Sequence, residues 1–298
     1  MQQRHHFVLA LVAVLTLAGC SAPGDITRGW SAPAAPSYAT PRPGDCLTGA
    51  FSAFEQPDRA VAGTVPCTAE HTVEVVTTGD LPADGAPPAW DSDPVRAAFA
   101  ACGTAASEYL GGDWHTGRVF PYLSLPGAPA WNAGVRTWVC GLAVAADDLF
   151  GPLARTGSLR DGLKDTRPLA LGCVDLDGSG VTPEGFYTSI DAVVPVLCTD
   201  AHDTEFAGLY TAPEGPFPAD AAALNETVSR ACFTQVAAFL GTTEPQLYGR
   251  KDIYIFWDGL TRSQWQLGDR VAHCFLNVPA THPLHTSVRG LGSGPLPS

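Results

Sequence analysis

The stretch Cys67-Thr-Ala-Glu-His71-Thr-Val-Glu74 returns later in the chain as Cys198-Thr-Asp-Ala-His202-Asp-Thr-Glu205. Both stretches fit the pattern Cys-x-x-x-His-x-x-Glu, and an apolar run rich in valine precedes each of them. A motif that recurs inside a longer shared pattern indicates that one structural unit occurs twice in the chain.

Cysteine positions extend the repeat on both sides of this motif. Successive cysteines are 21, 35 and 38 residues apart in the first copy, and 25, 34 and 42 apart in the second. Each copy ends with Trp-x-x-Gly-x-Arg-x-x-x-Cys, at Trp131 to Cys140 and at Trp265 to Cys274. We therefore predict two tandem homologous domains, residues 43–146 and residues 168–278.

Each copy contains one long helical pattern between strand patterns. Apolar residues recur at helical spacing over residues 93–110, where Asp93-Pro94 suits a helix start and Gly111 a helix end. The second copy repeats this pattern over residues 224–240, before Gly241. Runs rich in β-branched or aromatic residues predict strands over residues 61–66, 73–77, 137–144, 192–197, 205–210, 253–257 and 271–278. The predicted fold class is α+β, with a mostly antiparallel sheet and one main helix in each small domain.

The N-terminus has the features of a processing signal. Arg4 precedes an apolar run from Phe7 to Ala18, which is too short to cross a bilayer. The sequence Leu17-Ala18-Gly19-Cys20 that follows resembles a bacterial lipoprotein signal, in which the cysteine is lipidated and becomes the mature N-terminus. This resemblance predicts removal of residues 1–19 and a lipid anchor at Cys20 on the outer face of the cytoplasmic membrane. The alternatives are an ordinary signal peptide or the start of a buried helix.

Composition separates the domains from the segments around them. Residues 20–42 are rich in proline, alanine and serine, which predicts a tether. Residues 147–167 mix glycine, proline and charge, which predicts a linker with about one helical turn. Residues 279–298 contain glycine, proline and serine without a period, which predicts a disordered tail.

The net charge of -13 argues against one class of partner. Lys164 and Lys251 are the only lysines, and acidic residues outnumber basic ones by 30 to 17. Phosphate backbones are bound by clustered lysine and arginine, so we expect no nucleic-acid partner.

The eight cysteines after Cys20 predict disulfides, because an even number in an exported chain usually forms a disulfide framework. The chain has no Cys-x-x-Cys pair, which zinc sites commonly use. Four cysteines in a domain allow three pairings, and we favour pairing in sequence order. The predicted disulfides are Cys46–Cys67, Cys102–Cys140, Cys173–Cys198 and Cys232–Cys274.

The His-x-x-Glu pairs are the strongest candidates for a functional site. On a helical turn His71 and Glu74 would share a face and could bind a metal or form an acid–base pair. On a strand they would point to opposite faces, and two ligands are too few for a catalytic zinc. The competing interpretation is a histidine that hydrogen-bonds the backbone where a strand begins, with a structural glutamate. We keep His71, Glu74, His202 and Glu205 as candidate binding residues and predict no catalytic residue, no metal and no cofactor.

Two other motifs have simple structural interpretations. Asp175-Leu-Asp177-Gly-Ser179-Gly180 begins like a calcium loop but has Phe186 where the final glutamate should be, so we predict a solvated hairpin turn. The Trp-x-x-Gly-x-Arg elements could form a recognition surface, but we predict a core tryptophan covered by the arginine. The chain contains no Gly-x-Ser-x-Gly and no His-Glu-x-x-His hydrolase motif.

These residues together resemble the septum formation domain of actinobacterial envelope proteins. The resemblance rests on Gly44-Asp45-Cys46, on the segment from Val65 to Glu74 and on the helix with Cys102; the second copy has Leu171-Gly172-Cys173 and lacks the aspartate. It implies a link to septum formation in cell division and implies no chemistry.

We therefore expect a lipid-anchored, extracytoplasmic, non-enzymatic binding or scaffolding protein, with cell-envelope proteins or cell-wall material as partners. Two alternatives remain open. One is a metal-assisted hydrolase that uses the His-x-x-Glu pairs, and the other is a ligand-binding lipoprotein with an apolar site between its two domains.

Overall fold

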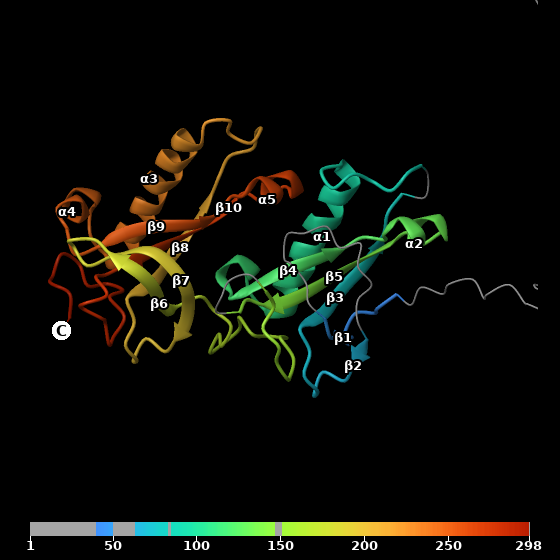
Figure 1. The fold of residues 1–298 in the computed structure, drawn as a ribbon, viewed down its shortest axis with the longest axis horizontal. Helices are drawn as coiled ribbons and strands as arrows, with labels where there is room; N and C mark the ends of the chain where they lie inside the picture. Colours follow the sequence, from blue (N-terminus) through green and yellow to red (C-terminus); the bar gives the residue numbers. More distant parts are fainter. Residues whose placement is uncertain (1–39, 50–62, 83–84, 147–150, 298) are drawn as a thin grey trace, which may run out of the picture. The chain divides into compact units, whose positions relative to one another are not determined.

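The structure is a computed structural model that describes residues 40–49, 63–82, 85–146 and 151–297 (Figure 1). These residues form two halves, each with a five-stranded antiparallel sheet and one long helix, so the predicted α+β class is confirmed. The predicted signal of residues 1–19, the lipidation site Cys20 and most of the predicted tether lie outside the described residues.

The sheet of the first half has the strand order β2-β1-β3-β5-β4. Its strands are β1 (Cys46–Leu47), β2 (Thr64–Val65), β3 (Val73–Asp80), β4 (Val119–Ser124) and β5 (Thr137–Val144). The helices are α1 (Asp93–Leu110), the short 3-10 helix η1 (Trp114–Thr116) and α2 (Ala128–Asn132).

The sheet of the second half has the corresponding order β7-β6-β8-β10-β9. Its strands are β6 (Cys173–Val181), β7 (Tyr187–Val196), β8 (Thr204–Thr211), β9 (Tyr254–Gly259) and β10 (Val271–Asn277), and its helices are α3 (Ala221–Leu240), α4 (Glu244–Tyr248) and α5 (Arg262–Leu267). The same order of strands, with the long helix after the third strand in each half, supports the internal repeat inferred from the cysteines.

The two long helices begin and end where local chemistry favours it. Pro94 occupies the first turn of α1, and the Asp220 side chain accepts hydrogen bonds from the first backbone N–H groups of α3. Gly111 and Gly241 end the helices with φ of 73° and 69°, a left-handed conformation that glycine adopts without steric cost. Each helix buries one apolar face against its sheet: Val95, Ala98, Cys102, Ala106 and Leu110 in α1, and Val228, Cys232, Val236, Phe239 and Leu240 in α3.

Four disulfides, two in each half, join the elements in the sequence order predicted from the cysteines. Cys46–Cys67 and Cys173–Cys198 close the first hairpin of each half, and Cys102–Cys140 and Cys232–Cys274 tie the long helix to the last strand. Each closed loop of 21 to 42 residues contributes roughly 3 kcal/mol in the chain-entropy picture. That contribution is large for a domain of about 100 residues.

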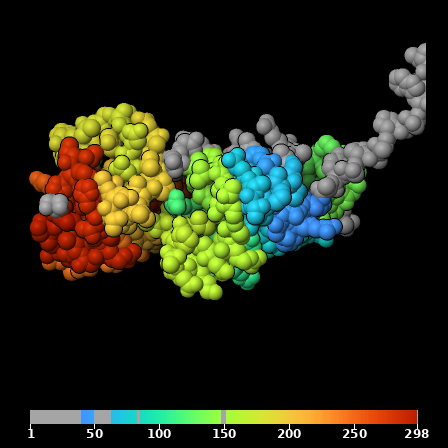
Figure 2. Space-filling view, turned by 90° about the horizontal axis from the view of Figure 1, so that it is seen from below, coloured from blue at the N-terminus to red at the C-terminus, as the bar shows by residue number. Residues whose placement is uncertain are grey.

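Two segments expected to lie outside the domains are parts of them. We name residues 151–167 the first strap and residues 279–297 the second strap. Leu159 and Leu163 of the first strap are buried in the core of the first half, and Leu284 and Val288 of the second strap are buried in the core of the second. Residues coloured red, which include the second strap, form a continuous part of the surface of the second half (Figure 2). The structure thus corrects the expected disordered tail for residues 279–297 and the expected linker for residues 151–167.

The structure also corrects one local expectation. Asp175 to Gly180 lie in strand β6 and not in a turn, and the turn after it is closed by a hydrogen bond from Gly185 N to Thr182 O. Strand β9, predicted from its aromatic sequence, is the edge of its sheet and has Tyr254 exposed. The expectation for the tryptophans is confirmed, because Trp131 and Trp265 are buried with the guanidinium groups of Arg136 and Arg270 over their rings.

Replacing Leu284 by alanine tests whether the second strap belongs to the fold. Loss of a fully buried leucine should lower the free energy of unfolding by about 3 kcal/mol. The measurement is denaturant unfolding of the disulfide-intact protein. His285→Ala, an exposed neighbour, is the matched control and should change the free energy by less than about 0.5 kcal/mol. Equal stability of both variants would contradict the packing of this strap.

Candidate functional site

His71 and His202 are buried and bonded to the backbone at the start of strands β3 and β8. The Nδ1 atom of His71 lies 2.9 Å from the Ala69 carbonyl oxygen, and that of His202 lies 2.8 Å from the Asp200 carbonyl oxygen. The main chain of His71 exchanges two hydrogen bonds with Arg155 of the first strap. His202 exchanges the same pair with Leu284 of the second strap. Each histidine therefore fixes a tight turn and pairs its backbone with a strap.

Glu74 holds the first strap through its carboxylate. The hydroxyl groups of Tyr109 and Ser158 donate to Oε1 over 2.5 Å and 2.7 Å, and the Leu159 N–H donates to Oε2 over 2.6 Å. A buried carboxylate is costly unless such donors replace its hydration. Three donors, two of them from the first strap, supply that replacement.

Glu205 holds the second strap in the same way. The Ser287 hydroxyl donates to Oε2 over 2.5 Å, and the Val288 N–H donates to Oε1 over 2.8 Å. His202 Nε2 lies 3.5 Å from Oε1 as well, whereas His71 Nε2 has no hydrogen-bond partner among the described residues. The His-x-x-Glu residues are thus brought together only in the second half, and loosely.

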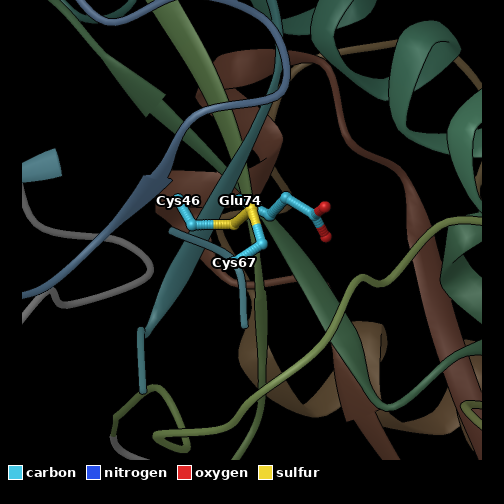
Figure 3. A group of neighbouring side chains, drawn as sticks. All are labelled: Cys46, Cys67 and Glu74. Atoms are coloured by element: carbon cyan, nitrogen blue, oxygen red, sulfur yellow. A yellow bond between two sulfur atoms is a disulfide. The ribbon is translucent and has the colours of Figure 1, made fainter. Parts of the chain in front are cut away.

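Glu74 also lies beside the disulfide Cys46–Cys67, and Glu205 lies beside Cys173–Cys198. Figure 3 shows the Glu74 side chain extending past the two joined sulfur atoms, with its carboxylate directed away from them. Metal ions are bound by thiolates, and sulfur atoms that share a disulfide are not thiolates. The donor set at these two places therefore does not suit a metal ion while the disulfides are intact.

Residues of both halves line an open cleft. The described residues belong to one compact unit, and the cleft has a volume of about 1140 Å³. Its aromatic walls are Phe99 and Trp114 from the first half and Phe217 and Trp265 from the second. The Arg262 guanidinium lies over the Phe217 ring, 4.4 Å from its centroid. Aromatic walls with a few placed charges are typical of binding sites.

His115 joins the two halves at the floor of this cleft. Its Nδ1 lies 2.7 Å from Asp113 and its Nε2 lies 3.5 Å from Asp269, while His273 Nε2 lies 2.9 Å from the His115 carbonyl oxygen. Burial lowers the pKa of His115, but the two carboxylates outweigh it and raise the pKa overall. Burial lowers the pKa of the neighbouring His273. Leu267 of α5 packs into the core of the first half and completes the contact.

Asp203 is a buried acid whose surroundings disfavour its ionised form. Burial raises its pKa to about 6, although hydrogen bonds from Thr204 and from the Leu176 N–H lower it. The corresponding residue of the first half, Thr72, is uncharged and donates to the carbonyl oxygens of Leu47 and Gly49. Pairing between β6 and β8 ends at Val174, and the Asp203 carboxylate accepts the hydrogen bond of the Leu176 N–H, which β8 leaves without a strand partner.

A protein-family model described as "Septum formation" matches residues 43–274 of the chain. The chain belongs to the septum formation family. The resemblance drawn from the two Cys-x-x-x-His-x-x-Glu stretches is thereby confirmed for the family. No curated protein and no solved structure matches the chain.

Membership of the septum formation family, together with four disulfides, indicates an extracytoplasmic protein with a possible role in septum formation. No helix within the described ranges has the length and apolarity needed to cross a bilayer. The matched residues begin before β1, end within β10 and do not include the second strap.

Sequence reasoning on this septum formation protein missed the partners of the two glutamates. A signal existed: Gly157-Ser158-Leu159-Arg160 resembles Thr286-Ser287-Val288-Arg289, and the serines follow their glutamates by 84 and 82 residues. Both arginines also cover aromatic rings of the long helices, Arg160 over Tyr109 and Arg289 over Phe239. The straps are therefore members of the repeat.

Tyr109→Phe tests the hydrogen bond to the Glu74 carboxylate. Phenylalanine is the residue at the equivalent position of the second half, Phe239. The change removes a hydroxyl 2.5 Å from a buried carboxylate, so the free energy of unfolding should fall by about 2 kcal/mol. Chemical denaturation checks the value. Tyr248→Phe, at a tyrosine that is 70% exposed, is the control and should have no effect. A neutral result at Tyr109 would show that Ser158 and Leu159 satisfy Glu74 alone.

Asp203→Asn tests the buried acid by its pH dependence. The pKa is raised from 3.8 to about 6 in the folded state, so the stabilising neutral form is lost as pH rises through 6. An asparagine keeps Oδ1 as acceptor and stays neutral. Relative to the parent, the variant should gain about 3 kcal/mol in unfolding free energy between pH 3.8 and pH 7.5. Unfolding midpoints measured across this range would contradict the assignment if the difference between the two proteins stayed constant.

Proposed function

We propose that this septum formation protein is a lipid-anchored, non-enzymatic scaffold of the cell envelope that binds its partner in the cleft between its halves. The observation that carries the proposal is the cleft of about 1140 Å³ with aromatic walls from both halves. A cleft lined by two halves keeps its shape only while the two halves remain in contact. The buried contacts of His115 and Leu267 hold them together.

The anchor is proposed from the N-terminal sequence. Leu17-Ala18-Gly19-Cys20 has the spelling and position of a lipoprotein signal, and a doubly acylated cysteine gives stable membrane attachment. Residues 20–42 would then separate the folded part from the outer face of the cytoplasmic membrane. Partners in that location are envelope proteins or cell-wall material.

The structural use of the His-x-x-Glu pairs supports a binding role over the hydrolase alternative. A hydrolytic pair must reach its substrate and a water molecule. His71, Glu74, His202 and Glu205 are all buried, and their polar atoms mainly contact backbone and strap residues. We therefore propose that these four residues maintain the fold and that the partner contacts the cleft.

Immunolocalisation and cell fractionation of three variants test the proposal in the native cell. The parent should be found in the membrane fraction and be enriched at septa. Cys20→Ala should move to the soluble fraction. Arg262→Glu reverses the charge of an exposed residue that lines the cleft, and this variant should stay on the membrane and lose septal enrichment. Arg230→Glu reverses the charge of an exposed residue of α3; it is the control and should behave as the parent does.

Each failure in this experiment points to a different part of the proposal. Membrane retention of Cys20→Ala would contradict the lipid anchor. Septal enrichment of Arg262→Glu equal to that of the parent would contradict the cleft as the binding site. An even distribution of the parent protein around the cell would contradict the septal role.

A further inference from the structure

The hairpin β6–β7 forms a surface separate from the cleft, and its strands are longer than those described for the corresponding hairpin of the first half. Strand β7 has ten residues and β6 has nine, whereas β1 and β2 have two each. Strand β6 pairs with β8 only at Cys173 and Val174, but it pairs with β7 along its whole length. The hairpin therefore continues as a two-stranded ribbon beyond the five-stranded sheet, with β7 at the edge (Figure 1).

The ribbon is held at both ends. The disulfide Cys173–Cys198 closes its base. At its tip, the Ala280 N–H of the second strap donates to the Gly185 carbonyl oxygen over 3.0 Å, and Phe186 contacts the ring of Tyr254. A strand fixed in this way is already in the conformation that strand pairing requires, so β7 itself loses little conformational entropy when a partner strand binds.

The open edge of β7 offers backbone hydrogen-bonding groups. The Leu176 N–H points to Asp203 on the β8 side, so Leu176 and its register partner Val193 form a non-hydrogen-bonded pair. The N–H and C=O of Val193 therefore point outward, away from β6. Two residues on, Pro195 has the same orientation and carries no N–H, which agrees with this alternation.

Apolar side chains are concentrated on the same ribbon. Among the described residues, four of the seven exposed large hydrophobic side chains lie on the ribbon or directly after it: Val181 at 55%, Ile190 at 44%, Val194 at 37% and Leu197 at 70% exposure. Natural edge strands are usually protected by lysine, by proline or by a covering segment. Pro195 lies near the end of β7, and β7 contains no lysine.

The charge of the ribbon selects the kind of segment that fits. Residues 173–200 contain Asp175, Asp177, Glu184, Asp191 and Asp200 and no lysine or arginine. A second copy would place Asp191 against an equally acidic strand, and an anionic lipid surface would be repelled. We propose that β7 is a docking edge for an extended segment of an envelope protein in which apolar residues alternate with lysine or arginine, added as a sixth strand.

Binding of a synthetic peptide tests this proposal on the purified full chain. The probe is a labelled peptide in which valine and lysine alternate, titrated by fluorescence anisotropy, beside one in which valine and glutamate alternate. The valine–lysine peptide should bind and the valine–glutamate peptide should not. Val193→Pro removes the outward N–H without removing a bond to β6, and should weaken binding about tenfold. Val193→Thr keeps the backbone donor and should bind as the parent does.

Charge and fold are checked on the same proteins. Asp191→Asn should weaken binding of the valine–lysine peptide and reduce its dependence on salt. Unchanged melting temperatures would show that each variant folds. Equal affinity of the parent and Val193→Pro would overturn strand addition in favour of general attraction between opposite charges. Absence of binding, or a dimer in sedimentation that Val193→Pro abolishes, would overturn the proposed occupant. None of these outcomes bears on the anchor or the cleft.

Discussion

Two buried carboxylates, Glu74 and Glu205, are the constraint on which the rest of the structure depends. An ionised carboxylate loses several kcal/mol of hydration on burial and needs hydrogen bonds in return. Most of those hydrogen bonds come from the strap that follows each half in the chain. Docking of a strap and burial of its glutamate are therefore mutually dependent. The neighbouring disulfide fixes the first strand of each sheet directly opposite the glutamate.

Differences between the two halves separate what the fold needs from what this chain adds. Both halves keep the disulfides, the buried histidine and the serine that contacts the glutamate. They differ at Tyr109 and Phe239 beside the strap, and at Thr72 and Asp203 at the start of the third strand. Among the described residues the long ribbon is found in the second half, and there the Asp203 side chain accepts a hydrogen bond from the Leu176 N–H, just beyond the part of β6 that pairs with β8. The surface proposed for a partner strand thus lies beside a position, Asp203, at which the two halves differ.

Much of this architecture could be predicted from sequence because it repeats or is periodic. The two copies and both long helices follow from the spacing of matched residues. Pairing in sequence order is the favoured one of the three pairings that four cysteines allow, and the structure confirms it. The straps could not, because Leu284 and Val288 are isolated apolar residues in a glycine- and proline-rich segment. Strand β4 contains Pro121, which only an edge strand tolerates, and β6 contains Gly178 and Gly180, which suggest a turn. The contact of His115 with Asp269 joins residues without any local pattern, so only the tertiary structure reveals it.

Each strap follows its own half in the chain, so the two halves can finish folding one after the other. Ribosomes deliver a protein from its N-terminus, and domains generally fold as they appear. The first half can close as soon as residues 151–167 are available, while the second is still being made. The second half keeps an unpaired carboxylate until residues 284–288 arrive and bury it. A molecule without residues 279–297 would keep the eight paired cysteines and every strand of both sheets, yet the core of its second half would lack Leu284 and Val288 and would be more open to proteases.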